Sequence, residues 1–300
     1  MQDFIEKEYI ERARTIMEAL PYIQTFHGKT IVVKYGGAAM DESALKERIV
    51  QDFVLLSLVG VKLVIVHGGG PHITRLMERL GKEAIFVEGH RITDDETMEI
   101  TEMVLSGLIN KEIVSLINSN GGRAVGLSGK DGSLVTAKKK LDKSGKNIDF
   151  GLVGTIDCIN PEPIITLSNA GYTPVVSPVA IGKDGKSYNM NADTVAGAIA
   201  VSLGAERLIY LTDIKGIYRD VKDESTFIPS ITESEIVRLK NEGVITKGML
   251  PKIDSAVAAL KKGVKKVHII DGRIEHSVML ELLTDAGVGT EIMLDSEEQA

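Results

Sequence analysis

Two glycine-rich turns and a lysine in the sequence could together bind an anion. The run IVVKYGGAAM places Lys34 two residues before Gly36-Gly37, and LVIVHGGGP places Gly68-Gly69-Gly70 directly after a second β-branched run. Glycines at such positions permit φ > 0 and leave backbone N–H groups uncovered, which suits a phosphate or a carboxylate. Tight turns between strands and helices also carry glycine for packing alone, so one turn would be weak evidence. Two neighbouring turns indicate an anion site.

The familiar nucleotide-binding motifs do not explain these turns. The stretch 67–73 lacks the third glycine of a dinucleotide fingerprint, and neither HGKT at 27–30 nor SGKD at 128–131 has the spacing and hydroxyl residue of a P-loop. A second cation, Lys252, follows Pro251 just inside an expected helix, where it opposes the helix dipole unless it faces an anion. Either lysine alone could be a solvated surface residue. Together with the glycine turns they resemble a clamp for a transferring phosphoryl group.

Short β-branched runs alternate with longer stretches of helical spacing, and this order must position the turns. The runs predict strands over 30–35, 62–67, 123–128, 173–179, 207–212 and 265–270, with helices over 42–59, 94–118, 192–203 and 249–262. Such alternation predicts an α/β fold with a mainly parallel sheet, and the apolar strands indicate helices on both faces. Ligands of such folds bind at the carboxyl ends of the strands. We expect a surface hairpin within 134–152 and a boundary between two lobes near Pro178.

Composition excludes several classes of protein. The 300 residues are 43% hydrophobic and 26% charged, with a net charge of −7, which argues against a general nucleic-acid binder. No long apolar run predicts a membrane span, and the charged start MQDFIEKEY does not resemble a signal peptide, so we expect a cytoplasmic protein. The single cysteine, Cys158, excludes an internal disulfide and a Cys-rich zinc site. Its apolar neighbours predict an inert buried thiol.

The first twenty residues form a separate amphipathic pattern. Apolar residues recur at helical spacing from Ile5 to Leu20, and Pro21 is expected to end this helix. The α/β order does not need such a helix. It could pack on its own domain or, because an apolar stripe needs a partner, on another subunit.

Seven motifs carry a resemblance to a known family. KYGGAAM, VIVHGGGP, GHRITD, GLSGKDG, YNMNADTVAGAIA, YLTDIKGIY and GMLPKI occur in the order of the amino-acid kinase family, over about residues 18–292. The resemblance implies a three-layer αβα sandwich with a mainly parallel central sheet. It divides the chain into a helix at 1–21, an N-terminal lobe at 22–177 for the acetylated amino acid and a C-terminal lobe at 178–300 for MgATP. The resemblance is most specific to the branch of the family that phosphorylates the γ-carboxylate of N-acetyl-L-glutamate in arginine biosynthesis.

The resemblance also assigns residues. The implied catalytic residues are Lys34, Lys252 and Asp193, the substrate-binding residues are Gly69, Gly70, Arg91 and Asn189, and the nucleotide- or phosphate-binding residues are Gly36, Gly37, Asp213, Lys215 and Tyr218. Asp193 could instead serve the first turn of its helix, and Arg91 could pair with Asp94 or Asp95 at the surface. We expect Mg²⁺ to arrive with ATP, without a metal site held by the protein. Ala38 stands where relatives generally carry Asn or Ser, which puts one side-chain contact in doubt.

The two ends of the chain resemble the arginine-sensitive, hexameric branch. In that branch the N-terminal helix links dimers into a hexamer, and His268, Glu281 and Gly287 would help form a site for arginine as inhibitor. His268 could instead be a core histidine, and Gly287 a helix C-cap. Two other hypotheses remain: a sister kinase acting on glutamate, aspartate or carbamate, which GHRITD disfavours, and a non-catalytic amino-acid sensor, which would not need both lysines.

Overall fold

An eight-stranded sheet forms the centre of the chain in the computed structural model, which describes residues 2–40, 42–142, 145–220, 222–245, 249–285 and 287–295. Its strands, in spatial order, are β14 (Ser230–Thr232), β16 (Thr290–Met293), β15 (Lys266–Asp271), β11 (Arg207–Thr212), β1 (Thr30–Tyr35), β2 (Lys62–His67), β8 (Thr173–Ser177) and β5 (Ala124–Ser128). The β15–β16 pairing is antiparallel and the other pairings of this sheet are parallel. Each of the six predicted strands therefore lies in this sheet.

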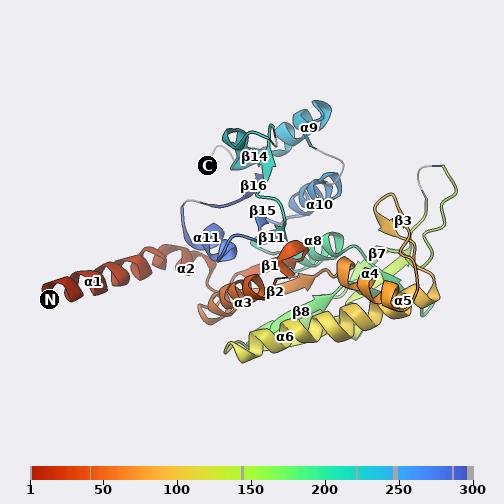
Figure 1. Cartoon of the computed structure of the whole chain (residues 1–300), viewed down its shortest axis with the longest axis horizontal. Helices are drawn as coiled ribbons and strands as arrows, with labels where there is room; N and C mark the ends of the chain where they lie inside the picture. The colour runs from red at the N-terminus through yellow and green to blue at the C-terminus, as the bar shows by residue number, and fades with distance from the viewer. Residues whose placement is uncertain are drawn as a thin grey trace.

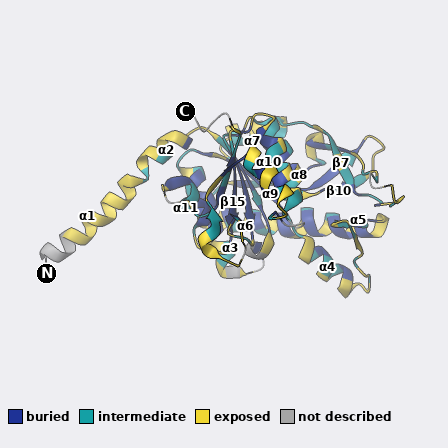
Figure 2. Cartoon of the chain, turned by 90° about the horizontal axis from the view of Figure 1, so that it is seen from above, coloured by how far each residue is buried: buried dark blue, intermediate teal, exposed yellow. Residues whose placement is uncertain are grey.

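Helices cover both faces of the sheet, as Figures 1 and 2 show. On one face, buried side chains of α3 (Ser43–Leu58), α4 (Gly70–Arg79), α5 (Asp95–Glu102), α6 (Asn110–Ser119) and α11 (Ser277–Leu283) join one hydrophobic cluster. On the other face, α7 (Glu162–Asn169), α8 (Ala192–Ser202), α9 (Glu233–Asn241) and α10 (Leu250–Leu260) join a second. The predicted αβα sandwich with a mainly parallel sheet is confirmed.

Strand alternation decides which face each side chain meets. Ile31 and Val33 of β1 belong to the cluster under α3 and α6, whereas Val32 belongs to the cluster under α8 and α10. Lys34 has the parity of Val32, because successive side chains of a strand point to opposite faces. It is therefore directed toward α8 and α10, the helices that carry Asp193 and Lys252.

A second, four-stranded sheet packs beside the first. Its order is β10 (Ser187–Asn189), β9 (Val179–Gly182), β6 (Val135–Lys139) and β7 (Gly154–Ile159). The antiparallel β6–β7 pair forms a hairpin over 135–159, so its second strand lies beyond the predicted range 134–152. Cys158 lies on β7 and is exposed, so the prediction of a buried thiol is wrong. The reason is that β7 is an edge strand, with only part of its surface covered. The predicted boundary near Pro178 falls between β8 and β9, and both predicted lobes contribute strands to the large sheet through the β1–β11 pairing.

The helix predicted over 94–118 is three consecutive segments. Between α5 and α6 the chain forms a π-helix, Met103–Ile109, which pattern alone does not reveal. Two short strands, β3 (Phe86–Val87) and β4 (His90–Arg91), form a hairpin ahead of α5, and β12 (Ile217–Tyr218) pairs with β13 (Phe227–Ile228). A π-helical turn inside a helix is often found at a functional site, and this one lies beside the Gly68–Gly70 turn, as shown below.

The N-terminal residues project from the body as an arm (Figure 1). Helix α1 (Gln2–Glu18) is followed by α2 (Leu20–Phe26), with Pro21 in the first turn of α2. Pro21 therefore does not end the helical region as predicted, because proline is tolerated in a first turn. The side chains of Tyr9, Ile16 and Met17 are 60–73% exposed, so the packing of this stripe on its own domain is not found; the side chain of Ile5 lies outside the described part.

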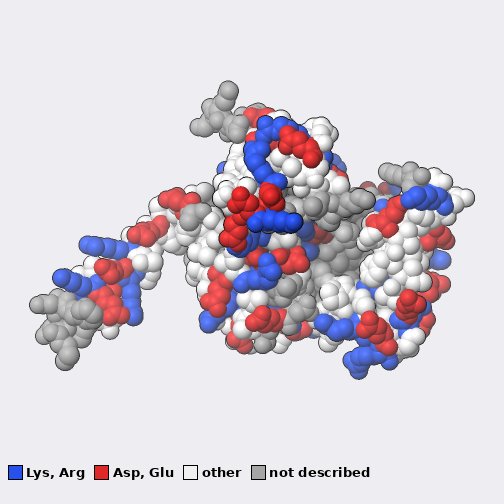
Figure 3. Space-filling model, turned by 45° about the horizontal axis from the view of Figure 1, so that its top comes forward, with Lys and Arg blue, Asp and Glu red and all other residues white. Residues whose placement is uncertain are grey.

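The arm carries charges of both signs, as Figure 3 shows. On α1, Arg12 donates to Glu8 one turn away. On the face shown, basic and acidic side chains are interspersed along the described part of the arm. Within the described ranges, no helix is long and apolar enough to cross a membrane.

Candidate active site

A buried cluster of three charges lies at the carboxyl end of β1. The Lys34 Nζ lies 3.1 Å from Asp193 Oδ1, and Lys252 Nζ donates to Asp193 Oδ2 at 2.8 Å. The three side chains are 12–17% exposed. Asp193 and Lys252 come from the first turns of α8 and α10, which pack against each other. Sequence positions 34, 193 and 252 are thus brought together as predicted.

Asp193 does not cap its own helix. The cap of α8 is Asn191, whose side chain accepts from the Thr194 N–H. Burial alone would raise the pKa of Asp193, but Lys34 and Lys252 outweigh this effect and hold its pKa below the usual range. Burial, together with repulsion from Lys34, lowers the pKa of Lys252 against the opposing pull of Asp193. The carboxylate is therefore a fixed counter-charge for two cations.

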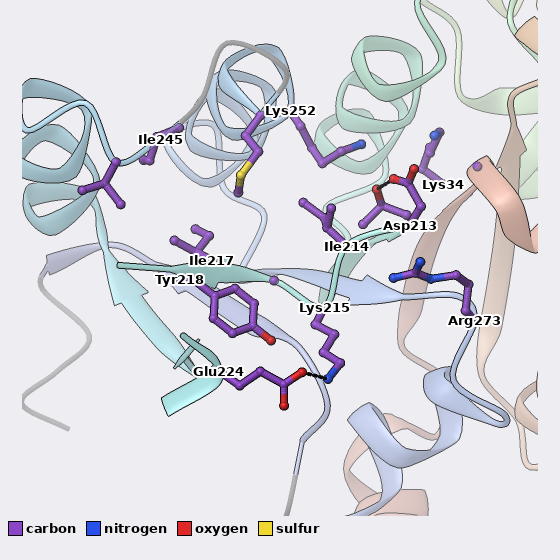
Figure 4. A pocket seen from close by; sticks show the side chains of 15 residues that line it. Lys34, Asp213, Ile214, Lys215, Ile217, Tyr218, Glu224, Ile245, Lys252 and Arg273 are labelled. Atoms are coloured by element: carbon purple, nitrogen blue, oxygen red, sulfur yellow. Dashed lines mark hydrogen bonds and ion pairs between the residues drawn. The ribbon is translucent and has the colours of Figure 1, made fainter. Parts of the chain in front are cut away.

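The two lysines line a cavity of about 710 Å³ (Figure 4). Gly37, Asp213, Lys215 and Tyr218, which were predicted for the nucleotide, line the same cavity. Lys215 donates to Glu224 at 2.8 Å, and the side chain of Thr212 donates to Asp213 at 3.1 Å. Several apolar side chains, Ile214, Ile217, Val244, Ile245 and Met249, complete the lining. A cavity with apolar walls and cationic groups at one end suits a nucleotide.

Arg273 and Glu224 also line this cavity, and neither was predicted. Arg273 follows the carboxyl end of β15 and donates from Nε and Nη2 to Asp271 at 2.8–3.2 Å. Its place just beyond the carboxyl end of a predicted strand, where ligands of such folds bind, is the signal that could have found it. Glu224 begins a short 3-10 helix, Glu224–Thr226, between β12 and β13, and no sequence pattern points to it.

A smaller cavity of about 200 Å³ contains the predicted substrate residues. Its lining includes the turn Gly68–Gly70 together with Arg91, Asn189 and Asn191. The side chain of Lys34 connects it to the large cavity, because a Cβ placed on Gly36 would lie 2.6 Å from Lys34 Nζ and one on Gly68 would lie 4.0 Å from Lys34 Cε. The lysine therefore runs past both glycine turns.

Arg91 is buried and faces this cavity. Its Nη2 donates to the Gly70 carbonyl at 3.0 Å and to Thr74 Oγ1 at 2.8 Å, and its guanidinium lies over the Phe86 ring. Burial lowers the pKa of Arg91 from its ordinary value. The alternative pairing with Asp94 is not found, since Asp94 accepts from Lys82 at 2.8 Å and caps α5.

The glycine turns leave fewer amides available than the sequence implies. The Gly68 N–H donates to the Tyr35 carbonyl at 2.8 Å, so the prediction that this amide faces the crevice is wrong. A Cβ on Gly69 would lie 2.4 Å from Ile109 Cδ1 and 2.6 Å from Leu105 Cδ2 of the π-helix, so these methyl groups would have to move. Asn189, on the far wall, donates to Thr93 Oγ1 at 3.3 Å. The backbone of Ala38 lies in a 3-10 turn after Gly37, and its side chain lies outside the described part.

The three residues predicted for arginine also lie together, away from these cavities. His268 Nδ1 lies 2.6 Å from Glu281 Oε1, and Glu281 Oε2 accepts from the Val288 and Gly289 amides at 2.7 and 3.0 Å. Burial would raise the pKa of Glu281, but these donors outweigh it and lower the pKa. Gly287, with φ +49°, lies four residues past the end of α11, so it is not the C-cap of that helix.

The sheet order and the helices that carry the charged cluster lie almost wholly within a segment that matches a known family. Residues 29–271 match the model of the amino acid kinase family, and the chain belongs to this family. It is therefore a phosphotransferase. The described residues contain no group of three or more His, Cys, Asp or Glu side chains placed to hold a metal ion.

Individual members of the family and related solved structures are also similar to the chain. The chain is 53% identical over 287 residues to the acetylglutamate kinase of Desulfitobacterium hafniense, which covers 94% of this chain and 96% of that relative. Among solved structures it is similar to N-acetylglutamate synthase of Neisseria gonorrhoeae with coenzyme A and N-acetyl-glutamate, at 27% identity and a TM-score of 0.83 over 94% of this chain. The same synthase with coenzyme A and L-arginine gives 26% identity and a TM-score of 0.78 over 92% of this chain. The chain spans 63–64% of the synthase chains.

Proposed function

We propose that this kinase transfers the γ-phosphoryl group of ATP to the γ-carboxylate of N-acetyl-L-glutamate, the acetylglutamate kinase step of arginine biosynthesis. The observation that supports it most directly is the Lys34–Asp193–Lys252 cluster, whose lysines line the large cavity while Lys34 also passes the Gly68 turn of the small one. Phosphoryl transfer needs little covalent chemistry from the protein, so positioned cations account for most of the rate enhancement. The acetylglutamate kinase at 53% identity supports the choice of acceptor.

The cavities match the two proposed substrates in size and chemistry. ATP would occupy the 710 Å³ cavity, with its base among the apolar side chains and its phosphates toward Lys34 and Lys252. The acceptor would occupy the 200 Å³ cavity. There Arg91 can take the α-carboxylate, because its Nη1 has only the Met77 sulfur at 3.3 Å, a weak acceptor that a carboxylate would replace.

The residues act by holding charge in place. Lys34 and Lys252 stabilise negative charge that shifts from the nucleotide toward the acceptor, and Asp193 keeps both ammonium groups at that position. The amides of Gly69 and Gly70 can donate to the γ-carboxylate under attack, with Asn189 on the opposite wall. Mg²⁺ would come with the ATP phosphates and neutralise part of their charge.

A steady-state assay with ATP and N-acetylglutamate tests this function, with glutamate, aspartate and carbamate as competing acceptors. We expect turnover that depends on Mg²⁺ and strongly favours the acetylated substrate. No turnover would favour an amino-acid sensor. Preference for another acceptor would favour a sister kinase.

We further propose that arginine inhibits the enzyme at the His268–Glu281 site and that the α1 arm assembles dimers into a hexamer. Glu281 offers a buried carboxylate for a cationic ligand, with Gly287 beside its Oε2. Helix α11, which carries Glu281, lines a cavity of about 580 Å³ together with Tyr22 and other residues at the base of the arm. The solved synthase chain that holds L-arginine supports a shared arginine-binding architecture.

Inhibition and assembly can be measured separately. We expect L-arginine to inhibit the full chain and light scattering to give the mass of a hexamer. Inhibition that is absent at millimolar arginine would refute the regulatory proposal, and a dimeric mass would refute the assembly.

A further inference from the structure

A buried polar pair lies at the carboxyl end of β2, on the face opposite the charged cluster. His67 and Asn110 are both 0% exposed. His67 has the parity of Leu63 and Ile65, which pack under α3 and α6, so its ring points toward the start of α6. The phosphoryl-transfer steps described above do not use either side chain. Burying two polar groups costs free energy unless each is hydrogen-bonded, so their hydrogen bonds show what the pair does in the structure.

The hydrogen bonds fix the protonation state of His67. Its Nδ1 lies 2.8 Å from the Gly68 carbonyl, which can only accept, so Nδ1 carries the proton. Its Nε2 lies 3.3 Å from Asn110 Nδ2, a donor whose orientation is set by a 2.8 Å bond to the Val175 carbonyl and by Lys111 Nζ at 3.1 Å from Asn110 Oδ1. A proton on Nε2 would face another donor. Burial, with the nearby Lys111 charge, lowers the pKa of His67 to about 4.

The same bond fixes a peptide plane. The Gly68 N–H donates to the Tyr35 carbonyl at 2.8 Å, and the Gly68 carbonyl accepts from His67, so the peptides on both sides of Gly68 are held. The carbonyl and N–H of a trans peptide point in opposite directions, and the described residues contain no cis peptide. The Gly69 N–H is therefore directed away from the His67 ring. Gly69 lines the 200 Å³ cavity.

We propose that His67 is a positioning residue that aims the Gly69 amide at the acceptor carboxylate. This inference rests on the proposed function, because it assigns the Gly69 N–H to the acceptor site. His67 touches no substrate; it acts through the Gly68–Gly69 peptide, with Asn110 holding its ring. A rigid donor of this kind costs no reorganisation at the moment of reaction. A side chain at Gly69 would displace the terminal methyl groups of Leu105 and Ile109.

Two substitutions separate this role from simple core packing. His67→Leu fills the site but removes the donor, whereas His67→Asn places an amide nitrogen near the position of Nδ1 and can keep it. We expect His67→Leu to lower kcat/KM for N-acetylglutamate by about 100-fold, since a displacement of about 1 Å at a reacting centre has that effect. We expect His67→Asn to recover most of this loss, and KM for ATP to change less than about 2-fold in both.

Ile65→Val on the same strand is the matched control. Ile65 is fully buried on the same face as His67, so this variant loosens the core near the turn without touching a hydrogen bond. Its kcat should stay at the wild-type value. Circular dichroism melts identify any variant that fails to fold. If His67→Leu loses less than 3-fold in kcat/KM, or if His67→Asn loses as much as His67→Leu, the positioning role is wrong.

Nuclear magnetic resonance of ¹⁵N-histidine-labelled protein tests the geometry without an activity measurement. The signal that disappears in His67→Asn should be a neutral ring protonated on Nδ1, with no titration between pH 5 and 8. A ring that titrates near pH 6.5, or one protonated on Nε2, would overturn the inference. If the expected tautomer is present but the wild type does not phosphorylate acetylglutamate, the proposed function fails and the peptide geometry stands.

Discussion

Replacing Asp193 by asparagine should destabilise the unliganded enzyme and at the same time strengthen nucleotide binding. The substitution keeps the size of the side chain and removes the carboxylate shared by Lys34 and Lys252, at 3.1 and 2.8 Å. At an effective dielectric constant of about 20, each contact gives roughly 5 to 6 kcal/mol of attraction, much of which offsets desolvation. Removing one partner of a buried pair typically costs about 3–5 kcal/mol. We therefore expect a loss of at least about 3 kcal/mol, or roughly 6 °C in Tm at about 2 °C per kcal/mol.

Nucleotide phosphates should replace part of the missing negative charge. Both lysines line the nucleotide cavity, and in the variant their ammonium groups lack a carboxylate. A non-hydrolysable ATP analogue should thus bind more tightly to Asp193→Asn than to the wild type and raise its Tm further. Turnover should fall by about 100-fold, because the lysines are no longer held at the transfer position. Tighter binding with slower chemistry distinguishes a counter-charge from a nucleotide ligand.

Low pH should reduce the difference in Tm between the wild type and Asp193→Asn. The folded-state pKa of Asp193 is held below the usual range, so its contribution is present above the unfolded-state pKa of about 3.9 and is lost as pH falls through the folded value. The Tm gap between wild type and Asp193→Asn should therefore be constant near neutral pH and narrow below pH of about 4.

Asp254→Asn is the matched control for this substitution. Asp254 lies on α10, two residues after Lys252, and pairs with Lys240 while 63% exposed. Its loss should cost less than about 1 kcal/mol. Because the chain has no tryptophan, unfolding is best followed by circular dichroism and binding by calorimetry. If Asp193→Asn costs less than about 1 kcal/mol and leaves nucleotide affinity and kcat unchanged, Asp193 serves only the helix dipole and the counter-charge argument is wrong.

Further substitutions test the remaining parts of the site. Lys34→Ala and Lys252→Ala should each lower kcat far more than they raise KM in steady-state assays. As the pH rises, the wild-type rate should begin to fall before the ordinary lysine pKa is reached, because burial lowers the pKa of Lys252. Arg91→Lys should raise KM for acetylglutamate by about 10-fold or more without changing KM for ATP, since an ammonium cannot make the paired contact of a guanidinium; an unchanged KM would contradict the assignment. Glu281→Gln should abolish inhibition by arginine with kcat unchanged, and retained inhibition would place the ligand elsewhere. Removal of 2–18 should reduce the mass in light scattering and weaken arginine inhibition, whereas an unchanged mass would exclude the arm from assembly.

The sequence was sufficient to predict six of the eight strands of the large sheet and both lysines of the charged cluster. The six β-branched runs became strands of one sheet because apolar side chains on both faces have no other stable environment. Lys34 lies near the end of β1 and the glycine turns follow β1 and β2, so their meeting at one edge comes from parallel topology. Lys252 was selected from its place at an expected helix start, whereas Asp193 required the family resemblance, since nothing in the local sequence places one helix start beside another.

Other features depend on contacts that local patterns do not contain. Cys158 has apolar neighbours in sequence, but its strand lies at the edge of the small sheet, which leaves it exposed. The amide of Gly68 is taken by the carbonyl of Tyr35, a neighbour only through strand register. The π-helical segment Met103–Ile109 packs against Gly69, and its helical spacing differs too little from that of an α-helix to be recognised from apolar residues.

The register of β1 and β2 explains how one edge of the sheet can carry both the charged cluster and the buried His67–Asn110 pair. Lys34 pairs in register with Val66, and Tyr35 with His67, one residue further along. Because side chains alternate between faces, Lys34 reaches Asp193 on the side of α8 and α10, whereas His67 reaches Asn110 on the side of α3 and α6. If both lay on one face, a protonatable imidazole would border two lysines and a carboxylate. The one-residue offset places the imidazole on the other face, where burial lowers its pKa and its N–H bonds the Gly68 carbonyl.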